Sequence, residues 1–94
     1  MNRREQWRSV LHAEAKLWNA KTYSQLVSEL KEEQVYEVQH EGNPYQVEVE
    51  ILENTNAYLH YVISVDDGSI PASFQPMSES FICEKPGKSK LTTP

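Results

Sequence analysis

The stretch VYEVQHEGNPYQVEVEILENTNAYLHYVISV, residues 35–65, decides the fold of this chain. Apolar and polar side chains alternate along it with a period of two, which is typical of half-buried β-strands. Two short breaks divide it, Gly42-Asn43-Pro44 and Asn54-Thr55-Asn56, and both consist of residues that favour turns. The stretch therefore predicts an antiparallel meander of three strands, at about residues 35–41, 45–53 and 57–65.

Both turns place the same apolar side chains on one face of this sheet. A Gly42-Asn43 loop would align Val38 with Val47. The turn at residues 54–56 would align Val47 in turn with Ile63. A slip of one residue would invert either alignment, so their agreement identifies the face that packs on a core.

The opposite face of the same sheet is polar and acidic. In this register Glu37 lies opposite Glu48, a like-charge pair, and Glu50 lies opposite His60. A carboxylate can orient an imidazole for acid–base chemistry, but such chemistry also needs a cleft and a third group. We therefore expect Glu50 and His60 to form a cross-strand polar pair, and we assign no catalytic residue.

Before the strands, the apolar residues follow a helical period. Those of residues 3–19 fall on one stripe and those of residues 23–33 on another, which predicts two amphipathic helices. Thr22 and Gln25 have the spacing of a capping box at the start of the second helix. The short connection between the two segments favours a helical pair over a single rod.

Beyond the meander the periodicity weakens. Asp66-Asp67-Gly68 predicts a turn, and residues 69–80, which contain two prolines, predict an ordered loop or a crossover across the sheet. Residues 80–84 are apolar at Phe81 and Ile82, and they predict a fourth strand.

These elements predict a single α+β domain over residues 1–85. The N-terminal helical pair would pack on one face of an antiparallel sheet of three or four strands. Residues 86–94 begin with a Pro-Gly pair and carry two lysines, which predicts a disordered basic tail.

Composition restricts the class of protein. Cys83 is the only cysteine, so no internal disulfide can form. No apolar run approaches the roughly 18 residues of a transmembrane helix, and no secretory signal follows Met1. The histidines and carboxylates lack the spacing of zinc or calcium sites. We therefore expect a cytoplasmic protein without a metal, a cofactor or a membrane association.

Charge is distributed unevenly along the chain, whose net charge is −5. No lysine or arginine occurs between Lys31 and Lys85, and that stretch holds eleven carboxylates. Such segregation creates a directed field that steers the choice of partner. It disfavours nucleic acid and favours a basic protein, since the remaining basic stripe, at Arg4, Arg8 and Lys16, resembles an ordinary solvated helix face.

Our first functional hypothesis is a small non-enzymatic module whose acidic sheet face binds a basic protein, as an immunity- or antitoxin-type inhibitor would. Apolar anchors rimmed by charged residues are common in protein interfaces. The alternative for the same face is a solvated surface that resists aggregation. The predicted contact residues are Glu48, Glu50, Leu52, Glu53, Tyr58, His60 and Val62.

Two further hypotheses use other parts of the chain. The protein could be a ligand binder or small enzyme with an apolar pocket between the helices and the 69–80 loop. It could instead be a structural domain that forms homo-oligomers through the edge of strand 80–84. The residues expected to line the pocket are Trp7, Trp18, Tyr23 and Phe74, although two tryptophans on one helical stripe are also typical of core anchors.

Overall fold

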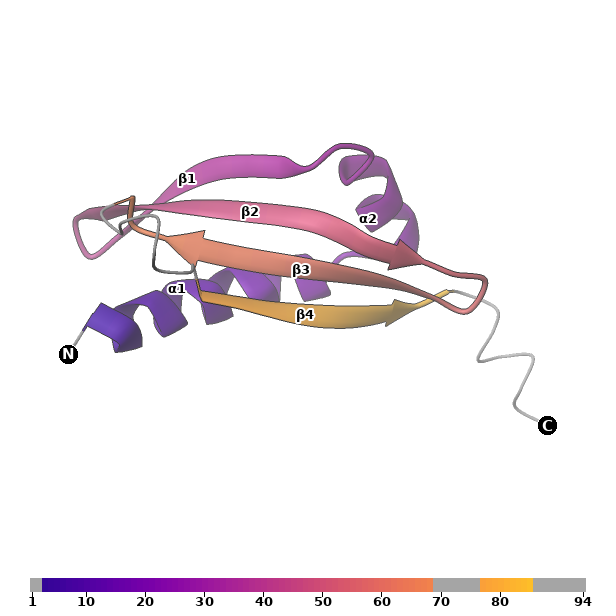
Figure 1. Ribbon diagram of the computed structural model, residues 1–94, viewed down its shortest axis with the longest axis horizontal. Coiled ribbons are helices and arrows are strands. Elements are labelled where there is room, and N and C mark those ends of the chain that lie inside the picture. The colour runs from indigo at the N-terminus through magenta and orange to yellow at the C-terminus, as the bar shows by residue number, and fades with distance from the viewer. Residues whose placement is uncertain (1–2, 69–76, 86–94) are drawn as a thin grey trace.

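Two helices precede a four-stranded antiparallel sheet in the computed structural model, which describes residues 3–68 and 77–85 (Figure 1). The helices are α1 (Arg3–Asn19) and α2 (Tyr23–Glu29). The strands are β1 (Gln34–His40), β2 (Asn43–Asn54), β3 (Tyr58–Asp66) and β4 (Met77–Glu84), and they neighbour one another in chain order. The predicted α+β fold is confirmed. The predicted tail, residues 86–94, lies outside the described residues.

The second helix is shorter than the sequence predicts. The capping box forms as expected: the Thr22 hydroxyl accepts the Gln25 N–H at 3.1 Å, and the Gln25 side chain accepts the Thr22 N–H at 2.8 Å. The helix ends at Glu29, where the side chain of Gln34 donates to the free Glu29 carbonyl at 2.8 Å. The acidic Glu32 would be unfavourable in a last helical turn, where the helix dipole is negative. These effects explain why residues 30–33 leave the helix.

The fourth strand is longer than predicted. It begins at Met77, so residues 77–80 belong to β4, and the prediction of a loop through residue 80 is wrong. Residues 69–76 lie outside the described residues. Within the strand, Val65 pairs with Met77 and Leu59 with Cys83, which aligns β4 along the full length of β3.

Pairing between β1 and β2 is displaced by two residues from the predicted register. Val38 lies opposite Tyr45, not Val47, because Glu41 and Gly42 form the two-residue turn. Both have positive φ, 51° and 83°, as a type I′ hairpin turn requires. A shift of two residues keeps every side chain on its predicted face.

The predicted cross-strand pairs on the polar face are therefore wrong. Glu48 lies opposite Val35, so the expected contact with Glu37 is not made. Glu50 lies opposite Val62 and His60 opposite Glu53, because β2 carries an irregularity between Ile51 and Glu53 and the β2–β3 turn lies later in the chain than predicted.

The β2–β3 turn is organised by one side chain, Thr55. Its hydroxyl accepts the N–H groups of Ala57 and Tyr58 at 3.1 and 3.0 Å. Its own N–H donates to the Tyr58 carbonyl at 2.9 Å. The loop therefore closes at Tyr58, two positions beyond the Asn54-Thr55-Asn56 turn expected from the sequence.

The core lies between the helices and one face of the sheet. In Figure 1, α1 runs along β3 and β4, and these contacts bury the apolar stripe of the helix. Trp7 and Trp18 are only 5% and 6% exposed, which confirms that they are core anchors. The other buried apolar residues are Val10, Leu11, Ala15, Leu26, Leu30, Tyr45, Val47, Val49, Leu59, Tyr61, Ile63 and Val65.

One polar network is buried between α1 and β1. The Tyr36 hydroxyl donates to the Glu14 carboxylate at 2.5 Å and accepts the indole N–H of Trp18 at 2.8 Å. Glu14 is 8% exposed and is the buried charged residue of the described chain. Burial and the adjacent Glu14 carboxylate hold the pKa of Tyr36 well above its usual value, so this hydroxyl remains a donor at neutral pH.

Neither helix in the described part of the chain is long and apolar enough to span a membrane. α1 is amphipathic, with exposed charged residues opposite its buried stripe.

Candidate functional site

The sheet face turned away from α1 and α2 is covered by no helix of the described residues, and we call it the outer face (Figure 1). Along β3, buried side chains toward the helices alternate with half-buried side chains on the outer face. Six of the predicted contact residues lie on the outer face by strand register, and Leu52 lies exposed at the β2 irregularity. Those six are Glu48, Glu50, Glu53, Tyr58, His60 and Val62.

Two exposed apolar side chains lie near one end of the sheet. Leu52 is 52% exposed and Ile82 is 55% exposed. His60 lies between β2 and β4, opposite Glu53 on one side and Ile82 on the other. Ile82 was not among the predicted contact residues, although the alternation Phe81-in, Ile82-out along β4 could have identified it.

Three carboxylates of β2 lie on the same face. Glu50 is exposed opposite Val62, and Glu53 is exposed and accepts the Tyr58 hydroxyl at 3.0 Å. Glu48 is half-buried between Val35 and the neighbouring strand β3. The four strands contain no lysine or arginine, so no strand side chain neutralises these charges.

The crowding of charge is reflected in the protonation of Glu48. Burial raises the pKa of its carboxyl, and a hydrogen bond shared with the Glu33 carboxyl raises it further. The negative charges of Glu33, Asp66 and Glu50 act in the same direction. A nearby cation would lower the pKa of Glu48. A cationic partner would therefore relieve a repulsion on this face that an isolated carboxylate does not experience.

Glu50 and His60 are the two outer-face side chains considered for acid–base chemistry. Since Glu50 and His60 are not paired, the one catalytic-looking contact expected from the sequence is absent. His60 is half-buried on β3, where its cross-strand neighbours are Glu53 of β2 and Ile82 of β4. Within residues 3–68 and 77–85, no group of three or more His, Cys, Asp or Glu side chains is placed to hold a metal ion.

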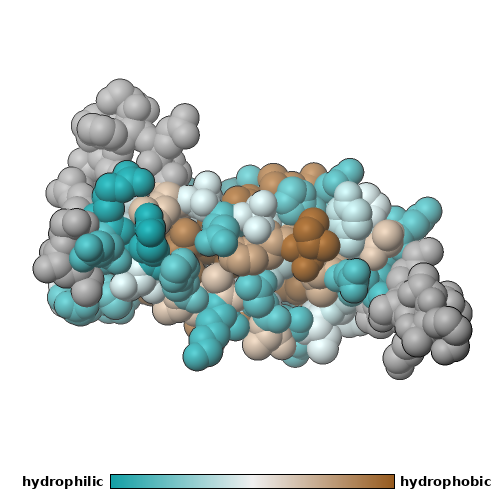
Figure 2. Space-filling model, turned by 90° about the horizontal axis from the view of Figure 1, so that it is seen from below, coloured by the Kyte–Doolittle hydropathy of each residue, from teal (hydrophilic) through white to brown (hydrophobic). Residues whose placement is uncertain are grey.

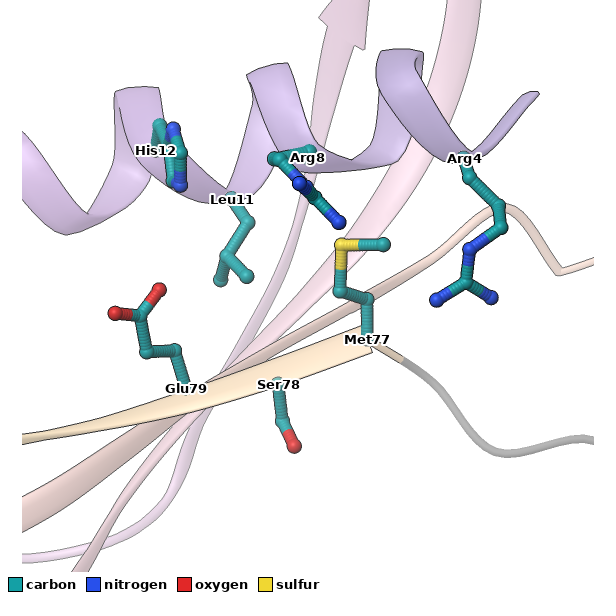
Figure 3. Close-up of a pocket in the computed structure, with 7 residues that line it drawn as sticks. All are labelled: Arg4, Arg8, Leu11, His12, Met77, Ser78 and Glu79. Atoms are coloured by element: carbon teal, nitrogen blue, oxygen red, sulfur yellow. The ribbon is translucent and has the colours of Figure 1, made fainter. Parts of the chain in front are cut away.

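A separate cavity of about 340 Å³ lies between α1 and the start of β4 (Figure 3). We call it the α1–β4 pocket. Figure 2, which views the molecule from below, shows hydrophilic side chains gathered near the start of α1 and hydrophobic ones farther along. The pocket is lined by Arg4, Arg8, Leu11, His12, Met77, Ser78 and Glu79.

The residues expected to line an apolar pocket do not form this one. Trp7 and Trp18 are buried in the core, and Tyr23 packs against it. Phe74 lies outside the described residues. No local sequence signal indicates the α1–β4 pocket, because Arg4 and Arg8 have the spacing of an ordinary solvated stripe.

Comparison of the chain with protein-family models, with curated proteins and with solved structures finds no significant match. Function is therefore inferred from the geometry of the outer face and of the α1–β4 pocket.

Proposed function

We propose that this protein is a small binding module whose outer face engages a basic protein, in the manner of an immunity- or antitoxin-type inhibitor. The observation that supports this most is the composition of that face. Two exposed aliphatic side chains, Leu52 and Ile82, lie on a sheet that carries outer-face carboxylates and whose strands contain no lysine or arginine. Apolar anchors contribute most of the affinity of such interfaces, and complementary charge contributes orientation and association rate.

The state of Glu48 strengthens the proposal. In the free protein its ionised form is disfavoured by burial and by the neighbouring carboxyl of Glu33. A lysine or arginine placed here by a partner would favour ionisation, and binding would then release protons. Affinity for a basic partner should therefore weaken as pH falls through the pKa of Glu48, in addition to weakening with salt.

Peptide selection tests the proposal and assumes nothing about the identity of the partner. A random peptide library displayed on phage, selected on the wild-type protein, should yield sequences in which Lys and Arg flank an aliphatic or aromatic residue. Their affinity should fall at least about tenfold for the double variant Glu48→Lys, Glu50→Lys. Both side chains lie on the outer face, so this variant should retain the wild-type fold.

The matched control makes the same change in net charge on the helices. Glu5→Lys with Glu29→Lys alters two exposed residues away from the sheet. Glu29 pairs with Lys21 at 3.1 Å, an exposed ion pair whose loss costs no more than about 1 kcal/mol. Equal loss of binding in both double variants would mean that only net charge matters, and it would refute a specific outer-face interface.

The edge of β4 favours a second candidate function, self-association. β4 is an outermost strand of eight residues and contains neither lysine nor proline, two residues that commonly protect sheet edges. Antiparallel pairing of two β4 strands would continue the sheet across a two-fold axis. Sedimentation velocity over a wide concentration range decides this, since a monomer at the highest concentration would contradict it.

A further inference from the structure

The α1–β4 pocket concentrates positive charge in a chain that is otherwise acidic. Arg4, Arg8 and His12 are spaced four residues apart on α1, which places them on the same side of the helix. In Figure 3 both guanidinium groups extend from α1 toward Met77 at the start of β4, and the Glu79 carboxylate extends from β4 toward His12.

Both guanidinium groups are available for a ligand. Within the described residues, neither Arg4 nor Arg8 forms an ion pair. Glu79 is the acidic residue of the pocket, and Figure 3 shows it opposite His12 and away from Arg4. A pair of arginines can bind a carboxylate or phosphate through several parallel N–H donors, which lysine cannot match.

The remaining walls indicate the shape of the ligand. Leu11 is buried beneath the pocket, and Met77 is half-buried beside the arginines, so the interior has an apolar side. The volume of about 340 Å³ is at the low end for small-molecule sites, which run from roughly 300 to 1,000 Å³. At the other end of the pocket, Glu79 disfavours a second negative charge.

We propose that the α1–β4 pocket binds a small organic anion, with its single carboxylate or phosphate head between Arg4 and Arg8 and its uncharged body against Leu11 and Met77. This site is distinct from the outer face, and it differs from the tryptophan-lined apolar pocket expected from the sequence. Because the two sites use different residues, the pocket can bind its ligand whether or not the outer face binds a protein.

Titration of the ¹⁵N-labelled protein with four probes tests this proposal by amide chemical shifts. Phenyl phosphate and benzoate share an apolar body and differ in the head, inorganic phosphate has only the head, and benzyl alcohol has no charge. We expect saturable shifts in residues 4–12 and 77–79 for phenyl phosphate or benzoate, with a Kd of about 1 mM or tighter. Whichever of phenyl phosphate and benzoate binds more tightly identifies the preferred head group. Inorganic phosphate and benzyl alcohol should both bind at least about tenfold more weakly.

Two double variants distinguish binding at the α1–β4 pocket from a general effect of net charge. Arg4→Gln with Arg8→Gln should weaken binding at least about tenfold, whereas Lys16→Gln with Lys31→Gln, which removes the same charge from other exposed positions, should not. The outer-face variant Glu48→Lys, Glu50→Lys should bind the anion as the wild type does. Absence of saturable shifts for both organic anions, equal binding of benzyl alcohol, or equal loss in both charge-removal variants would overturn the proposal.

Discussion

Replacing Tyr36 with phenylalanine should destabilise the fold through a single lost oxygen. That hydroxyl donates to Glu14 at 2.5 Å and accepts from the indole of Trp18 at 2.8 Å. Glu14 and Trp18 are 8% and 6% exposed, so water cannot readily replace the lost partner. The variant therefore leaves a buried carboxylate and a buried N–H group unsatisfied.

The magnitude follows from these two groups. An unsatisfied buried donor or acceptor costs about 1–3 kcal/mol, and a charged one more. We expect Tyr36→Phe to lower the free energy of unfolding by about 2–5 kcal/mol, a large part of the roughly 5–15 kcal/mol typical of a domain. Adding Glu14→Leu to Tyr36→Phe should restore part of the loss, because it removes the unpaired carboxylate.

Urea unfolding followed by tryptophan fluorescence measures these differences. Tyr58→Phe is the matched control, since its hydroxyl bonds only the exposed Glu53 carboxylate, and it should change stability by about 0.5 kcal/mol or less. A cost for Tyr36→Phe equal to that of the control would refute the reasoning and mean that water reaches Glu14 in the folded protein.

Three further predictions concern the acidic face, the alkaline limit of stability and the first hairpin. Glu48→Gln should stabilise the fold at pH 7 by roughly 0.2–1 kcal/mol, because burial and Glu33 raise the pKa of Glu48 and disfavour its ionised form. Urea unfolding should show that this gain disappears below about pH 4, and a gain independent of pH would contradict the assignment. Burial raises the pKa of Tyr61 to about 12, so the stability that its protonated hydroxyl contributes is fully present below pH 10 and is lost as pH rises from 10 through 12. Tyr61→Phe should lose less stability over this range, and identical pH profiles of Tm for the wild type and the variant would exclude this cause. Glu41→Asn should stabilise the fold by about 0.5–1 kcal/mol and Gly42→Ala should destabilise it by about 1–2 kcal/mol, because both positions have positive φ. The opposite order of Tm values would show that a different pair of residues forms the turn.

Side-chain alternation was sufficient to predict the faces of the sheet but not its register. A slip of two residues leaves every side chain on its face, so the apolar pattern of Val38 and Val47 fits the predicted and observed pairings equally well. The difference lies in the turn, where Glu41 adopts a positive φ that its side chain does not favour. In the observed register Tyr36 reaches Glu14 and Trp18, a tertiary contact that no local pattern reveals.

Alternation also explains which site residues could be predicted. Six of the seven predicted contact residues follow from the pattern within β2 and β3, and all seven are exposed or half-buried after the shift. The α1–β4 pocket depends on contact between a helix and a strand far apart in the sequence. Arg4 is a candidate binding residue only because the fold places it in the same pocket as Met77, so its spacing along α1 could not identify it.

Mapping a selected basic peptide by amide chemical shifts tests the central claim most directly. Titrated into the ¹⁵N-labelled protein at low salt, the peptide should shift the outer-face amides of β2, β3 and β4, including those of Glu50, His60 and Ile82, and leave α1 and α2 unchanged. These shifts should vanish in the Glu48→Lys, Glu50→Lys variant and persist in the Glu5→Lys, Glu29→Lys variant. Shifts confined to the helices, or shifts retained when the outer face is reversed in charge, would contradict the proposed function.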